Sequence, residues 1–359
     1  MKYSRQHLNR SVKISGRGFC AALIVVMGFG FVLSAMPPAQ AQTLVVLHTF
    51  TGKKDGGNPL GGLVQDPSAN LYGTTYGGGT AGLGTLFKLD PTGKETVLHN
   101  FAGKTDGAYP WSGPYRDAAG NLYGTGEAGG KFHYGAAYKW TAGKETVLYS
   151  FPGTKGGGYP FDGVVRDSAG NIYTTLWKGG AHGYGGVFKL TPSGKPSILY
   201  NFEGLTDGGY PYDSLILDSA NNLYGTTYWG GTSAEAGVVF KLDPTGKETV
   251  LYTFKGGNDG ANPWSSLVRD SAGNLYGTTF SGGTAGYGVV FKLDTSGVET
   301  VLHSFQGGSD GENPVAGLTM DASGNLFGTT YYGGTSDFGT VFEVDSSGTE
   351  TVLYSLSLI

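Results

Sequence analysis

The chain has 359 residues, of which 66 are glycine and 13% are aromatic, and its formal net charge is −4. This mildly acidic balance argues against nucleic acid or an anionic membrane as a partner, because both need clustered Lys and Arg. The single cysteine, Cys20, excludes a framework of intramolecular disulfides.

The first 41 residues have the basic, apolar and small-residue zones of a secretory signal peptide. The basic zone holds Lys2, Arg5, Arg10, Lys13 and Arg17. The apolar run that follows, residues 19–33, is shorter than the roughly 20 residues that span a bilayer, which disfavours a membrane anchor. We therefore predict cleavage after Ala41 and no membrane insertion afterwards. The mature chain would have no cysteine, 19 Lys and Arg, and 28 Asp and Glu, a formal charge of −9.

One phrase, Val/Ile-Leu-His/Tyr-x-Phe, recurs along the mature chain at steps of about 51 residues. The copies end at Phe50, Phe101, Phe151, Phe202, Phe254 and Phe305, and a weakened copy ends at Leu356. A fixed period of this length is typical of propellers and solenoids, in which copies of one unit bury each other's apolar faces.

The unit from Asp259 to Phe305 predicts four strands, over residues 266–270, 274–280, 289–294 and 299–305. Each run is short, rich in β-branched or aromatic residues, and bounded by Gly, Asn, Asp or Pro. Asp-x-x-Gly-Asn and Asp-x-x-Gly turns link neighbouring runs tightly. Each unit is therefore expected to be an up-and-down sheet of four strands.

Six such units predict an all-β fold, a six-bladed β-propeller over residues 42–359. An additional strand, Thr43–Phe50, precedes the first unit. Either this strand or residues 351–356 could take the outer place where the ring closes, leaving the other as a fifth or frayed strand. Pro114 lies in a predicted first strand, which fits an edge facing the channel. An open β-solenoid is the alternative fold, but its coils have shorter periods.

The repeated pattern resembles the bacterial tandem-repeat family known as GloVer. It runs D-G-x-x-P, then G-L-V-x-D-x-x-G-N-L-Y-G-T-T, then G-G-T, then V-F-K-L-D-x-x-G-x-E-T-V-L-Y-x-F, over essentially the whole mature chain. The resemblance implies an exported bacterial protein with no established activity or catalytic residues. Many members carry a C-terminal anchor, which this chain lacks, so we expect a secreted or periplasmic protein.

Aromatic residues gather in the loops expected on one face of the disc, where sugar stacking or a protein partner would suit them. Packing between blades is the alternative explanation for each ring. The predicted ligand-binding residues are Tyr109, Trp111, Tyr159, Phe161, Trp177, Tyr210, Tyr212, Trp229 and Trp264.

The repeated aspartates are more easily explained as turn formers than as ligands. None of their loops has the calcium-binding spacing, so we predict neither a metal nor another cofactor. His48, His99 and His303 share one strand position with tyrosines of other repeats, which rules out an essential ligand role there.

Two aspartates break the repeat at equivalent positions. Asp162 and Asp213 stand where the other units have Gly61, Ser112, Ser265 and Ala316. Two carboxylates near Glu127, His133, Lys178 and His182 could catalyse general acid and base steps on a glycosidic bond. Two unrelated surface aspartates are the alternative.

These observations predict an exported, monomeric, non-catalytic scaffold that binds a glycan or an exported protein. A hydrolase or lyase acting on polysaccharide through Asp162 and Asp213 at the channel mouth is the alternative. A structural protein of the cell envelope is a third possibility.

Overall fold

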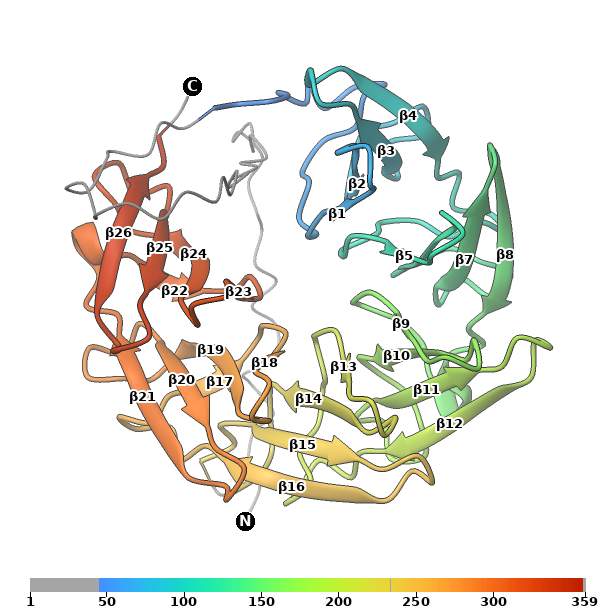
Figure 1. The fold of residues 1–359 in the computed structure, drawn as a ribbon. Helices are drawn as coiled ribbons and strands as arrows, with labels where there is room; N and C mark the ends of the chain where they lie inside the picture. The colour runs from blue at the N-terminus through green and yellow to red at the C-terminus, as the bar shows by residue number, and fades with distance from the viewer. Residues whose placement is uncertain (1–44, 233, 358–359) are drawn as a thin grey trace, which may run out of the picture.

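The computed structural model describes residues 45–232 and 234–357, so the signal peptide predicted over residues 1–41 lies outside the described part. Six antiparallel sheets follow one another around a central axis (Figure 1). Each sheet is formed by one repeat, which confirms the six-bladed β-propeller. No helix among the described residues is long and apolar enough to cross a membrane.

The first three blades each have four strands, ordered from the axis outward. The first blade contains β1 (Val64–Gln65), β2 (Leu71–Thr75), β3 (Thr85–Leu89) and β4 (Glu95–Asn100). The second contains β5 (Tyr115–Arg116), β6 (Leu122–Gly126), β7 (Ala136–Thr141) and β8 (Lys144–Ser150). The third contains β9 (Val165–Arg166), β10 (Ile172–Leu176), β11 (Gly186–Leu190) and β12 (Pro196–Asn201), and a 3₁₀ turn, η1 (Thr154–Gly156), precedes it.

The last three blades follow the same order. The fourth contains β13 (Ile216–Leu217), β14 (Leu223–Thr227), β15 (Val238–Leu242) and β16 (Glu248–Thr253). The fifth contains β17 (Ala261–Pro263), β18 (Val268–Arg269), β19 (Leu275–Ser281), β20 (Val289–Leu293) and β21 (Glu299–Ser304). The sixth contains β22 (Glu312–Pro314), β23 (Thr319–Met320), β24 (Leu326–Tyr332), β25 (Thr340–Val344) and β26 (Glu350–Ser355), preceded by η2 (Gly308–Asp310).

The innermost strand is shorter than the sequence predicts, and in the fifth and sixth blades it is divided in two. β17 and β18 both pair with β19, with a turn between them. Asn262 and Pro263 lie within β17, where Pro263 pairs with Thr279, and residues 264–267 form the gap before β18. Pro114 lies directly before β5, at the sheet edge where a proline is tolerated.

The turn that joins the first and second strands of a blade depends on an aspartate. In the fifth blade, Asp270 Oδ1 accepts a hydrogen bond from the Asn274 amide at 2.8 Å, and Oδ2 accepts one from the Tyr276 hydroxyl at 3.1 Å. Burial opposes ionisation, but these hydrogen bonds outweigh it and lower the pKa of Asp270. The turn-forming role expected of this repeated aspartate therefore agrees with its contacts.

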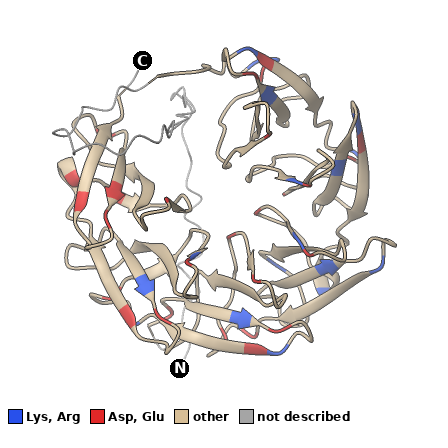
Figure 2. Ribbon diagram, viewed as in Figure 1, with Lys and Arg blue, Asp and Glu red and all other residues tan. Residues whose placement is uncertain are grey.

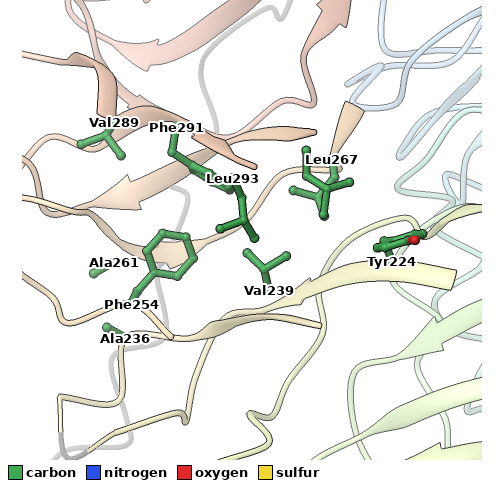
Figure 3. Packing of buried hydrophobic residues seen from close by; sticks show 10 residues of the cluster. Tyr224, Ala236, Val239, Phe254, Ala261, Leu267, Val289, Phe291 and Leu293 are labelled. Atoms are coloured by element: carbon green, nitrogen blue, oxygen red, sulfur yellow. The ribbon is translucent and has the colours of Figure 1, made fainter. Parts of the chain in front are cut away.

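Each of the first five outer strands is followed by a buried phenylalanine that packs on the next blade, whereas β26 is followed by Leu356. Phe254 follows β16 and its ring lies 5.2 Å from that of Phe291 in β20, at an edge-to-face angle of 73°. Both side chains are completely buried. Figure 3 shows this seam, the contact between successive blades, where residues of the fourth and fifth blades form one apolar cluster. The other ring pairs of this kind are Phe50–Phe87, Phe101–Tyr138, Phe151–Phe188, Phe202–Phe240 and Phe305–Phe342.

Of the two segments that could take the outer place where the ring closes, the C-terminal one does so, and the strand expected over Thr43–Phe50 is not formed by its described residues. Residues 45–50 form no strand, and β26 is the outer strand of the sixth blade. The N-terminal segment instead lies against the first blade, with Phe50 on Phe87 and Leu47 beside the same cluster (Figure 1). Among the described residues, no buried apolar cluster joins the sixth blade to the first. Phe50 thus replaces the phenylalanine of a preceding blade without a sheet behind it.

Glycines of the second strands make room for a large side chain of the third strand in the same blade. Gly277 pairs with Phe291 of the same sheet. A Cβ atom on Gly277 would lie 2.8 Å from the tip of the Phe291 ring and 2.9 Å from Leu267 Cδ2. The glycine therefore lets the large ring of the third strand lie across the second.

Charged residues are distributed over several blades, many of them on outer strands and peripheral turns (Figure 2). Five glutamates begin the outer strands or lie near their beginning and are partly buried at the seams. Burial, together with a nearby aspartate, raises the pKa of each to about 7: Glu95, Glu145, Glu248, Glu299 and Glu350. The folded protein therefore binds more protons than the unfolded chain between about pH 4.5 and 7.

This proton uptake predicts that stability is greatest below the unfolded pKa of the glutamates and falls as the pH rises through 7. The melting temperature should decrease between pH 5 and pH 7.5, measured by calorimetry with EDTA present. Glu299→Gln should reduce the decrease, because the glutamine stays neutral. A melting temperature that rises over this range would contradict the prediction.

A candidate ligand-binding face

The loop that enters each blade lies beside the loop between its second and third strands. Backbone bridges join them in the middle blades, between Ala108 and Ala128, between Gly158 and Lys178, and between Gly209 and Trp229. The aromatic residues predicted for ligand binding are carried by these paired loops. The structure thus brings together on one face segments that are about 20 residues apart in each repeat.

A band of eight aromatic rings crosses from the first blade to the fifth. Trp111 stacks on Phe161 with ring centroids 4.7 Å apart, and Phe161 meets Tyr212 at 5.2 Å. Tyr212 in turn lies 5.2 Å from Trp264. These four rings come from successive blades, and all are partly exposed. The aromatic band is completed by Tyr76, Trp177, Tyr228 and Phe280, each in contact with one or more of the four.

The other predicted aromatic residues form a second group that contacts the band. Tyr109 stacks on Tyr76 at 5.0 Å, and Tyr159 meets Trp177 edge-on at 6.1 Å. Tyr210 lies between Trp177 and Trp229, at 6.5 and 5.9 Å. All nine predicted ligand-binding residues therefore belong to one continuous aromatic surface, and each of them is partly exposed.

Three tyrosines of this surface have an unfavourable backbone conformation. Tyr109, Tyr159 and Tyr210 have φ of 54°, 54° and 53°, in the left-handed region that bulky residues rarely adopt. The first, fifth and sixth blades place asparagine at the equivalent positions, Asn58, Asn262 and Asn313, with the same sign of φ. Asparagine tolerates this conformation well. Only the second, third and fourth blades place a tyrosine in this strained backbone conformation. Strained residues of this kind cluster at functional sites.

Asp162 and Asp213 directly follow Phe161 and Tyr212 of the band, and the two side chains lie beside each other. Burial, a hydrogen bond to Asp162 and the charge of Asp162 raise the pKa of Asp213 well above its usual range. Asp213 is 7% exposed, and its Oδ1 accepts a hydrogen bond from the Ser214 amide at 2.7 Å. Its buried Oδ2 has no donor while both groups are ionised. A proton on Asp213 would give this oxygen a hydrogen bond to donate, which agrees with the raised pKa of Asp213.

The backbone of this pair is held by threonines of neighbouring strands. Thr125 of the second blade donates to the Asp162 carbonyl at 2.6 Å, and Thr175 of the third donates to the Asp213 carbonyl at 3.0 Å. The equivalent Thr74 of the first blade donates to Ser112. A contact repeated at successive seams thus places both aspartates next to each other.

Glu127 is the third acid of the region. Its Oε2 accepts a hydrogen bond from the Trp111 indole at 2.6 Å. Burial raises the pKa of Glu127, although the Trp111 hydrogen bond works in the opposite direction. Of the basic residues considered with it, Lys178 places its Nζ 3.7 Å from the Trp177 ring centroid, and His133 and His182 are exposed.

Sequence reasoning found the aromatic residues and the acidic pair but missed two features. Tyr76, Tyr228 and Phe280 were expected on this face, but their ring contacts with Trp111, Tyr212 and Trp264 could not be predicted from the sequence. The strained tyrosines were also missed. The exchange of Asn for Tyr before the repeated proline was visible, but only the backbone angles give it meaning.

Residues 27–232 and 160–358 match the model of the Gloeobacter/Verrucomicrobia repeat. The chain belongs to this family. Nothing among curated proteins matches it. The two matched ranges together include all six blades and the paired loops of the aromatic surface.

Solved structures with a similar fold include a gluconolactonase from Xanthomonas campestris, at 15% identity and a TM-score of 0.48, covering 76% of this chain and 83% of that one. A putative gluconolactonase has 13% identity and a TM-score of 0.47, with coverage of 84% and 92%. The tricorn protease has 12% identity and a TM-score of 0.48, with coverage of 84% and 27%. Likenesses at this level imply nothing about activity.

The strain argument predicts that Asn58→Tyr lowers the free energy of unfolding by about 1 kcal/mol, the lower end of the cost of such a conformation. Asn58 is exposed, and no described ring of a preceding blade is available to pack on a new tyrosine. Asn58→Gly, which suits a positive φ, is the matched control and should be nearly neutral. Urea unfolding measures both. Equal stability of Asn58→Tyr and the unaltered protein would show that the tyrosines are not strained.

Proposed function

We propose that the protein is an exported, non-catalytic scaffold that binds a glycan on the aromatic surface of its second, third and fourth blades. The observation that carries the proposal is the positive φ of Tyr109, Tyr159 and Tyr210. Asparagine would fit each position at lower cost, so the tyrosine rings are kept for something other than folding.

The chemistry of the surface supports a sugar as the ligand. Partly exposed rings offer flat apolar faces, and the C–H faces of a sugar ring stack on them. The carboxylate of Asp162 and the hydroxyl groups of the tyrosines can bond sugar hydroxyl groups. A rigid scaffold that presents its binding residues on loops is a common arrangement for such sites. A secreted or periplasmic location would expose the aromatic surface to polysaccharide.

A hydrolase or lyase is the second candidate, because a protonated Asp213 beside Asp162 is an acid next to a potential base. Two features weigh against it. Carboxyl groups that flank a glycosidic bond are about 5 Å or more apart, whereas these share a hydrogen bond. Asp213 is also buried, which leaves Asp162 as the partly exposed member of the pair.

The binding proposal predicts that Tyr159→Asn weakens glycan affinity about fivefold or more, since an aromatic contact contributes on the order of 1 kcal/mol. The variant recreates the Asn-Pro pair of the other blades, so its fold should be retained. A glycan array with the purified protein identifies the ligand, and titration calorimetry gives the dissociation constants. Phe338→Ala, an exposed ring of the sixth blade outside the aromatic surface, is the control and should bind normally.

Unchanged affinity of a folded Tyr159→Asn variant would contradict the proposal, as would the absence of any glycan bound on the array. The second outcome would favour a protein partner. Reducing-sugar release measured in parallel tests the enzyme alternative. Release that Asp162→Asn abolishes would overturn the non-catalytic assignment.

A further inference from the structure

Three potential metal ligands meet at the seam of the fifth and sixth blades, away from the aromatic surface. His303 lies in β21, Asp310 ends η2, and Glu350 begins β26. One ligand atom from each residue lies within 4.8 Å of the other two. All three side chains are partly buried. The outer strands of two blades and the loop between them thus contribute to one cluster.

The distances in the cluster suit a small divalent ion. His303 Nε2 lies 3.0 and 3.2 Å from the two oxygens of Asp310. Two ligand atoms each about 2.0–2.1 Å from a tetrahedral zinc ion are separated by about 3.3 Å. His303 and Asp310 therefore need little movement, and rotation of the Glu350 side chain brings in the third ligand.

The cluster also has an unsatisfied acceptor. Glu350 Oε1 is buried and has no hydrogen-bond partner, as is also true of the same oxygen in Glu95, Glu145, Glu248 and Glu299. At the seam of His303, two carboxyl groups face one imidazole, so this cluster attracts a cation.

We propose that His303, Asp310 and Glu350 bind a divalent transition metal of the zinc class, which joins the fifth and sixth blades. One imidazole nitrogen and two carboxylate oxygens form a ligand set that zinc commonly accepts, and a water completes the tetrahedron. The ion would fasten the last blade to the ring, where no following blade among the described residues packs on it. This site is independent of the proposed glycan-binding function.

Other seams carry a tyrosine at the position of His303, so the fold itself does not require a metal there. At the preceding seam Tyr252 replaces the histidine, and its hydroxyl donates to Asp259 at 2.8 Å, beside Glu299. A neutral phenol is a poor ligand for a divalent ion at neutral pH, so this seam holds itself together by a hydrogen bond. The histidine is therefore dispensable for the fold and specific to metal binding.

Two other seams have the same residue types, but among the described residues only His303, Asp310 and Glu350 bring three ligand atoms together. His99 Nε2 lies 3.1 Å from Asp106, and the corresponding distance from His48 to Asp55 is 3.9 Å. Their ligand atoms are not gathered as closely as those of His303, Asp310 and Glu350. Substitution of His303 should therefore remove one tightly bound zinc ion per chain and leave any zinc binding at the His48 and His99 seams unchanged.

The decisive experiment compares metal binding by the full chain and its His303→Tyr variant, both prepared without a histidine tag and freed of metal by EDTA. Zinc titration by calorimetry should show one tight equivalent fewer in the variant. Cobalt, used as a spectroscopic probe, should lose the intense visible absorption of a tetrahedral site. The melting temperature of the unaltered protein should rise with zinc, because the ion binds the folded state.

His303→Tyr should fold, since it reproduces the tyrosine seam, and Glu350→Gln provides a second variant that should also lose the equivalent. Glu299→Gln, at the tyrosine seam, should bind zinc as the unaltered protein does. Equal stoichiometry and affinity in the unaltered protein and both site variants would overturn the proposal. Failure of the unaltered protein to bind zinc at micromolar concentrations would do so as well.

Discussion

The insertion of a phenylalanine ring, either Phe50 or the residue after one of the first five outer strands, into the following blade is the contact on which the rest of the structure depends. Six ring pairs of the same kind have centroids 4.9–5.2 Å apart. Each four-stranded sheet has two apolar faces and cannot bury both by itself, so stability comes from the seams. The first blade follows the same rule even where the ring closes, since Phe50 occupies the place of a ring from a preceding blade.

Fixed seams bring the same loop of successive blades into register, and this is what creates the candidate site. Trp111, Phe161, Tyr212 and Trp264 occupy one position of the repeat, yet they form a continuous row only because neighbouring blades hold a constant spacing. The second, third and fourth blades then depart from the repeat at two positions. Tyrosine replaces asparagine at a strained backbone angle, and in the third and fourth blades aspartate replaces a small residue. Both departures cost stability, so selection for function is the simplest account of why they occur together.

Much of the fold could be predicted from the sequence because local and repeated signals agree. The Asp-x-x-Gly-Asn turns fix the hairpins, and the period of about 51 residues fixes the number of blades. Ring closure could not be predicted, since two segments of the same pattern compete for one place and the outcome depends on contacts between the ends of the chain. The short strands β17 and β22 were missed because each contains an Asn-Pro pair, which in a sequence is typical of a turn.

The candidate site was predictable in its residue types and less so in its chemistry. Breaks in the repeat identified Asp162 and Asp213, but the burial of Asp213 and its raised pKa depend on how closely two blades approach. The seam glutamates show the same limit. Their sequence context is polar, and only packing against the preceding blade raises the pKa of Glu299 or Glu350 to about 7. Partial burial between blades therefore sets the protonation of groups that the sequence would leave as ordinary surface acids.

The most direct test of this account is the stability of Phe254→Ala, which removes one ring from one seam and leaves every strand and loop in place. Loss of a fully buried phenylalanine should lower the free energy of unfolding by about 3–5 kcal/mol. Leu205→Ala, which truncates a side chain that is 66% exposed, should change it by less than about 0.5 kcal/mol. If urea unfolding gave equally small losses for the two variants, the blades would be held together by something other than these rings, and the account would be wrong.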